Sequence, residues 1–97
     1  WEIIRNFADG FFSCSDILTA NGMRILSNPL AGDPRVVAGE SGAVGTGLID
    51  EIIKRRPDIA EKIGLDKTSR VILFSTEGDT DTQNYRDIVW YGKYSRF

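Results

Sequence analysis

Histidine is absent from these 97 residues, and cysteine occurs only once, as Cys14. Without histidine, the chain cannot by itself build a Ser-His-Asp or Cys-His nucleophile system, or a zinc site with histidine ligands. A single cysteine excludes an internal disulfide and fits a reducing compartment such as the cytoplasm. The sequence also has no apolar run long enough to span a bilayer, so we expect no membrane segment.

Strong charge is lacking as well. A net charge of −2 gives no electrostatic reason to expect nucleic acid or an anionic membrane as a partner. The length suits one small domain. The chain opens on Trp1-Glu2-Ile3-Ile4, which reads as the middle of an element, so we expect a piece of something longer.

The apolar run Val71-Ile72-Leu73-Phe74 predicts a strand buried on both faces. Shorter runs predict two further strands, at 11–14 and 35–39. Helices are predicted at 1–8, 15–28, 41–56, 57–63 and 80–91. Strands that alternate with helices indicate an α/β fold, a three-layer piece in which a short parallel sheet of about three strands is flanked by helices.

Polar residues follow two of the predicted strands. Ser75 and Thr76 end the strand 71–74, and Gly78 and Asp79 lie in the turn after it. Glu40 follows the strand 35–39 and precedes a helix whose first turns hold Gly42, Gly45 and Gly47. Ligands in open α/β sheets bind beyond the carboxyl ends of strands, and glycine lets another backbone or a flat ligand come close. Both junctions are therefore candidate binding positions.

Two other interpretations of these junctions are open. Asp79 and Asp81 could share a divalent cation, but capping of the next helix by Asp81 is the commoner role, so we predict no metal site. The glycines at 42–47 open a helix, and helix N-termini attract anions. They lack the order of the dinucleotide fingerprint and the P-loop lysine. A non-catalytic small α/β anion-binding module is the alternative function.

Longer motifs carry a resemblance to a known family. Gly39-Glu40-Ser41-Gly42-Ala43-Val44-Gly45, the strand end Ser75-Thr76-Glu77-Gly78-Asp79-Thr80-Asp81 and the helix segment 85–90 resemble the C-terminal part of the diaminopropionate ammonia-lyases. The segments 1–6 and 22–29 resemble the same family, so the likeness covers essentially the whole chain. It implies that 1–97 is a single C-terminal α/β fragment of the larger catalytic domain of a fold type II, tryptophan-synthase-β-like enzyme.

The resemblance also implies a function. The family uses pyridoxal 5'-phosphate to convert 2,3-diaminopropionate to pyruvate and ammonia by α-proton abstraction and β-elimination. Its Schiff-base lysine and phosphate loop lie upstream of the matched region. We therefore expect no catalytic residue in this chain, and we expect enzymatic activity only from the full-length protein. The same resemblance implies that the full-length protein is a cytoplasmic homodimer. The four lysines lie in polar helix faces or turns, where an amine stays protonated: Lys54, Lys62, Lys67 and Lys93.

Site residues are carried over from the family one by one. The resemblance implies that Ser75, or else Thr76, hydrogen-bonds the pyridine nitrogen of the cofactor, and that Glu40 lies beside the ring. Gly78 and Asp79 complete the same turn. Local explanations stay open: Ser75 can satisfy the turning backbone, Glu40 can be a solvent-facing acid, and turn geometry accounts for the other two.

Aromatic side chains at both ends of the chain predict contacts with the rest of the enzyme or a partner chain. They are Trp1, Phe7, Phe11, Phe12, Trp90, Tyr91, Tyr94 and Phe97.

Overall fold

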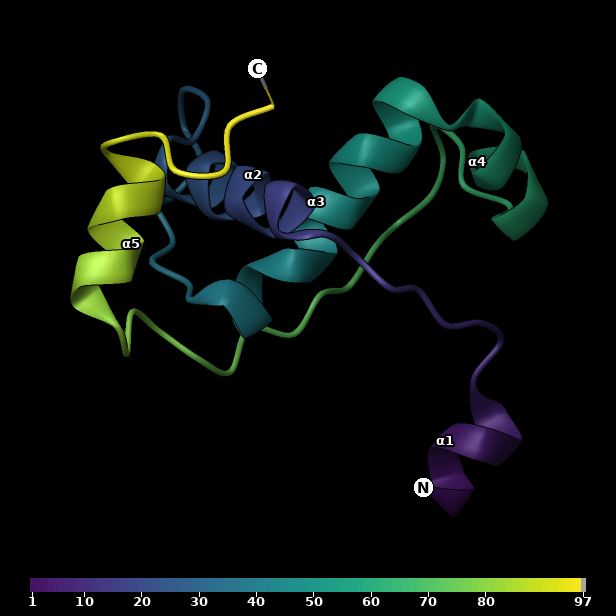
Figure 1. Ribbon diagram of the computed structural model, residues 1–97. Coiled ribbons are helices and arrows are strands. Elements are labelled where there is room, and N and C mark those ends of the chain that lie inside the picture. Colours follow the sequence, from purple (N-terminus) through teal and green to yellow (C-terminus); the bar gives the residue numbers. More distant parts are fainter. Residues whose placement is uncertain (97) are drawn as a thin grey trace.

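The computed structural model describes residues 1–96, which form five helices. Figure 1 shows α2 and α3 crossing at the centre, with α5 beside α2 and α4 at the far end of α3. The prediction made for Phe97 lies outside the described residues. The helices are α1 (Glu2–Phe7), α2 (Asp16–Ser27), α3 (Glu40–Arg55), α4 (Pro57–Ile63) and α5 (Thr82–Val89).

The predicted parallel sheet is wrong, because residues 1–96 contain no strand. The segments 11–14, 35–39 and 71–74 all lie outside the helices, but they pair with no neighbour to form a ladder. The predicted burial of segment 71–74 is also wrong, since Ile72 is 81% exposed and Phe74 is 84% exposed. An apolar, β-branched run favours a pleated, half-buried conformation, but it forms a sheet only if a neighbouring strand is present to pair with it.

Helix ends follow local signals. Pro57 opens α4 at its first turn, and Gly64 closes it in the left-handed conformation at φ 78°. The capping role expected for Asp81 is confirmed. Asp81 is the N-cap of α5, and its Oδ1 accepts a hydrogen bond from the backbone N–H of Asn84 at 3.0 Å.

The α2–α3 crossing is built on glycine. A Cβ at Gly22 would overlap the backbone oxygen of Ala43, and a Cβ at Gly47 would overlap the backbone oxygen of Leu18. The two helix backbones therefore touch without a side chain between them. The expectation that another backbone approaches the glycines of α3 is confirmed at Gly47, whereas Gly45 faces the side chain of Leu73.

A small core lies where α2, α3 and α5 meet. Its buried members are Ala20, Met23, Ala38, Ala43 and Ile88, with Leu26, Val36, Tyr85 and Val89 packed against them. Helix α1 has no buried residue, and Figure 1 shows it standing apart from the other helices. Across residues 1–96, none of the helices combines the length and the apolar character that crossing a membrane would need.

Candidate functional site

The segment before α3 and the segment 75–79 lie against each other. The backbone N–H of Gly39 donates to the oxygen of Glu77 at 3.1 Å. A Cβ added to Gly39 would come 2.6 Å from the Glu77 carboxylate, and one added to Gly42 would come 2.5 Å from Ser75 Oγ. Any other residue at these glycines would separate the two segments. The two junctions predicted from the sequence thus lie side by side.

A cavity of about 230 Å³ opens beside this contact. Four of its lining residues are carboxylates, contributed by the start of α3 and by the segment that leads into α5. The lining residues are Met23, Gly39, Glu40, Ser41, Glu77, Asp79, Thr80, Asp81, Asn84 and Tyr85. The hydroxyl of Tyr85 is buried and has no hydrogen-bond partner within residues 1–96.

The predicted site residues divide into three groups. Glu40 and Asp79 line the cavity. Ser75 and Gly78 lie next to it, where the Ser75 hydroxyl faces Gly42 and the Gly78 oxygen faces Gly39. Thr76 is exposed and is not among the residues that line the cavity or contact those glycines.

Glu40 is held by residues that the sequence did not suggest. Its Oε1 accepts a hydrogen bond from Asn84 Nδ2 at 2.6 Å, and Asn84 Oδ1 accepts one from Lys93 Nζ at 3.1 Å. Asn84 lies 44 residues from Glu40 in the sequence, and nothing in the sequence singled it out. The lack of a contact signal in a single sequence explains why it was missed.

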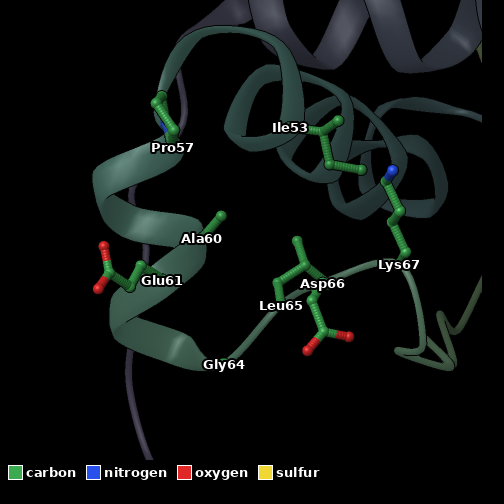
Figure 2. A pocket seen from close by; sticks show the side chains of 8 residues that line it. All are labelled: Ile53, Pro57, Ala60, Glu61, Gly64, Leu65, Asp66 and Lys67. Atoms are coloured by element: carbon green, nitrogen blue, oxygen red, sulfur yellow. The ribbon is translucent and has the colours of Figure 1, made fainter.

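A larger cavity, about 570 Å³, lies away from these residues between α4 and the end of α3. Figure 2 shows Pro57 and Ala60 on α4 and Ile53 on α3 facing it, with Asp66 and Lys67 at the following turn. Hydrogen bonds from the Thr68 side chain and backbone lower the pKa of Asp66. None of the predicted site residues lines this cavity, so the cavity has no link to the candidate site although it is larger.

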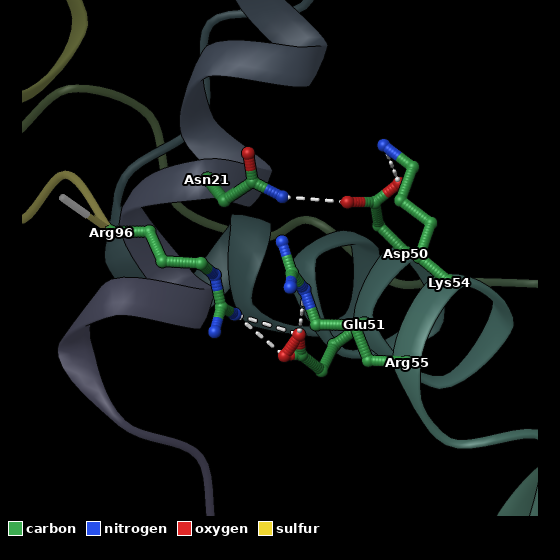
Figure 3. A network of polar contacts seen from close by, with 6 residues as sticks. All are labelled: Asn21, Asp50, Glu51, Lys54, Arg55 and Arg96. Carbon is green, nitrogen blue, oxygen red and sulfur yellow. Dashed lines mark hydrogen bonds and ion pairs between the residues drawn. The ribbon is translucent and has the colours of Figure 1, made fainter.

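A polar network joins α2, α3 and the last described residue (Figure 3). Asn21 donates to Asp50 at 2.7 Å, and Lys54 pairs with the same carboxylate at 2.9 Å. Glu51 pairs with Arg55 at 3.1 Å and with Arg96 at 2.6 Å. Asp50 thus joins α2 to α3, and Glu51 joins Arg96 to α3.

Residues 1–96 contain no group of three His, Cys, Asp or Glu side chains placed to hold a metal ion. Asp81 makes its contact as the N-cap of α5.

No protein-family model matches the chain. The chain is 48% identical over 97 residues to the diaminopropionate ammonia-lyase of Escherichia coli K12, and 45% identical over 96 residues to that of Salmonella typhimurium. These matches take in 98% and 96% of this chain but only 24% of each relative. The chain therefore spans about a quarter of the length of the curated relatives it matches.

Solved structures agree with the sequence matches. The apo form of the E. coli enzyme superimposes with a TM-score of 0.91 over 98% of this chain and 27% of its own. Its complex with an aminoacrylate-PLP azomethine intermediate gives 0.91, and its complex with D-serine gives 0.90, each over 25% of that chain. Sequence and fold together match this chain to one segment of a diaminopropionate ammonia-lyase.

Proposed function

We propose that this chain is the part of a diaminopropionate ammonia-lyase that supplies the pyridine-ring side of a pyridoxal 5'-phosphate site. The activity of the whole enzyme would be the conversion of 2,3-diaminopropionate to pyruvate and ammonia. The relatives bear this enzyme's name, and one solved relative holds an aminoacrylate-PLP intermediate. The observation that carries the proposal is the contact of Ser75 with Gly42, which brings the two predicted junctions together.

The residues present fit this cofactor. Ser75 is exposed, and its hydroxyl makes no hydrogen bond to the rest of the described chain, so it is free to bond a ring nitrogen. Glu40 is exposed at the start of α3, and only its Oε1 is engaged. The Ser75 hydroxyl and the Glu40 carboxylate lie on adjacent segments, so both could contact one edge of a flat heteroaromatic ring.

When bound, the cofactor's conjugated ring takes up the electrons released as the α-proton leaves, so that the β-amino group can depart. In this proposal Ser75 holds the ring nitrogen without the full charge of a carboxylate, and Glu40 lies beside the ring. Gly78 and Asp79 shape the turn that carries Ser75. Thr76 is the second candidate for the nitrogen contact, and it has weaker support because it touches neither the cavity nor the glycines.

The lysine that binds the cofactor is proposed to lie outside this chain. Lys54 is 64% exposed and pairs with Asp50, and Lys93 donates to Asn84. Lys62 and Lys67 are exposed. A Schiff-base lysine needs a desolvated site that lowers its pKa, and none of these environments favours one. The amino-acid substrate, the rest of the enzyme, a homodimer and a cytoplasmic location belong to the same proposal.

The anion-binding module has less support. Four carboxylates surround the start of α3, those of Glu40, Glu77, Asp79 and Asp81. Four negative carboxylates close together repel an anion more strongly than the N-terminus of one helix attracts it.

A chimera tests the proposal, with this chain replacing the matching segment of the E. coli enzyme. Ser75→Ala is expected to weaken pyridoxal phosphate binding by about 2- to 10-fold, the value of one hydrogen bond. Thr76→Val, one residue along, serves as the matched control and is expected to change binding less than twofold. If Ser75→Ala leaves both cofactor affinity and pyruvate release unchanged, the proposed site is wrong.

A further inference from the structure

Asn84 joins a carboxylate to an ammonium across three segments of the chain. Its Nδ2 donates to Glu40 Oε1 at 2.6 Å, and its Oδ1 accepts from Lys93 Nζ at 3.1 Å. Glu40 begins α3, Asn84 lies in the first turn of α5, and Lys93 follows the end of α5. We call this chain of hydrogen bonds from Lys93 through Asn84 to Glu40 the relay. It joins residues that are distant in the sequence.

The two charges fix the orientation of the amide. Rotating the Asn84 side-chain amide by half a turn would place its oxygen against the carboxylate and its nitrogen against the ammonium. Both contacts would become repulsive, so the carboxylate and the ammonium each select the same rotamer. Hydrogen bonds to charged groups are also stronger than neutral ones. Asn84 thus presents an N–H to Glu40 in one fixed direction.

Lys93 is itself held in place. Its backbone N–H donates to the oxygen of Asp87 at 2.9 Å, and its backbone oxygen accepts a hydrogen bond from the Arg24 guanidinium. Its ammonium also lies 5.0 Å from the centre of the Tyr94 ring. The far end of the relay is anchored to α2 and α5, so a change there would reach Glu40 through Asn84.

Glu40 shares its cavity with three other acids, Glu77, Asp79 and Asp81. Met23 contributes an apolar wall from α2, and Tyr85 contributes a phenol from α5. Lys93 is the cation that the relay brings to this acidic group. The hydrogen bond donated by Asn84 therefore fixes one oxygen of Glu40 within a group of like charges.

We propose that Asn84 is a positioning residue which, with Lys93 behind it, holds the Glu40 carboxylate in one orientation beside the cofactor ring. This rests on the proposed function, in which Glu40 lies against that ring. The relay acts through Oε1 and leaves Oε2 without a partner among residues 1–96. Asn84 and Lys93 then set the direction of the Glu40 carboxylate without touching the cofactor.

The test uses the full-length chimera loaded with pyridoxal phosphate, with the absorbance spectrum and the pH profile of kcat/KM as readouts. Asn84→Asp places two carboxylates within hydrogen-bond distance, where they share a proton. The acid limb of the profile should move to higher pH and the bound-cofactor spectrum should change. Lys93→Met should lower kcat about 2- to 10-fold, the value of one hydrogen bond, with KM changed less than twofold. Lys93→Arg should restore most of that loss.

The matched control is Gln83→Ala. Gln83 precedes Asn84 on α5, and its amide donates to Asp87 at 2.8 Å on the exposed side of the helix. Its removal should leave the spectrum, the pH profile and kcat unchanged. Thermal unfolding of each variant identifies any that fail to fold, and the Lys93→Met and Lys93→Arg pair carries the test if Asn84→Asp is one of them.

Glu40→Gln separates this proposal from the one it rests on. A changed spectrum in Glu40→Gln with unchanged profiles in the Asn84 and Lys93 variants overturns the relay and leaves the cofactor site standing. Unchanged spectra in both Glu40→Gln and Ser75→Ala overturn the cofactor site, and the relay with it.

Discussion

Arg24 of α2 donates a hydrogen bond from Nε to the backbone oxygen of Ile88, at 3.0 Å, in the last turn of α5. A second hydrogen bond from the same guanidinium reaches the backbone oxygen of Lys93. Carbonyl groups in the last turn of a helix have no partner within the helix, so Arg24 satisfies that of Ile88, and it also satisfies that of Lys93 beyond the helix end. Burial lowers the pKa of Arg24, although a guanidinium stays protonated at any ordinary pH.

Arg24→Met should destabilise the protein by about 1.5–3 kcal/mol, the value of hydrogen bonds to a charged group. Arg24→Lys should recover only part of this, because an ammonium lacks the forked donors that reach both carbonyls. Urea unfolding measures both variants. Arg70→Met is the control, since Arg70 is exposed and is in none of the ion pairs found among residues 1–96. Equal losses in Arg24→Met and Arg70→Met would show that α5 does not depend on Arg24.

Gly47→Ala should destabilise the protein by about 1–3 kcal/mol, because the new methyl group would meet the backbone of α2 and force the helices apart. Denaturant unfolding gives the magnitude. Gly10→Ala is the matched control, since nothing lies within 4 Å of the position its Cβ would take. A stable Gly47→Ala protein would mean that α2 and α3 can separate at little cost.

The Asp66 carboxylate should make stability depend on acid pH. Hydrogen bonds from Thr68 lower its pKa below the ordinary value of 3.8, so folding favours the ionised form. Its contribution is fully present above that value and is lost as the pH falls through the lowered pKa. An NMR titration of the side-chain carboxyl measures the midpoint. Thr68→Val removes the hydroxyl donor at 2.6 Å and should raise the midpoint toward 3.8; an unchanged midpoint would contradict the assignment.

The isolated chain should self-associate or bind a dye for apolar surfaces. Its exposed apolar residues include Trp1 at 78%, Phe7 at 79% and Phe74 at 84%. Patches of this kind on a soluble protein mark surfaces that another chain covers. Sedimentation of the double variant Ile72→Thr, Phe74→Ser should show less association than the parent. A monomeric parent at high concentration that binds no dye would argue against a covered surface.

Local features of the fold were predictable and distant ones were not. Pro57 and Gly64 fix the ends of α4 because each acts on its own backbone. The run 71–74 was misjudged because pairing needs a neighbouring strand, and a hydrophobic pattern does not say whether one is present. Tertiary context decided the outcome there.

The candidate site shows the same division. Glu40 and Asp79 were both singled out by their places after apolar runs, and they line one cavity. The hydrogen bonds that hold Glu40 come from Asn84 and, beyond it, Lys93, and no local signal marks either residue. Only the folded arrangement of α3, α5 and the turn after α5 brings them together.

Gly22 and Gly47 limit how descendants of this sequence can change. Each glycine faces a carbonyl of the opposite backbone, which every amino acid carries, so no substitution on the other helix can make room for a side chain. If either glycine is replaced, a smaller side chain on the opposite helix therefore cannot compensate for the added side chain. Selection from a randomised library should return glycine at both positions independently, while the solvent-facing residues of the same two helices drift.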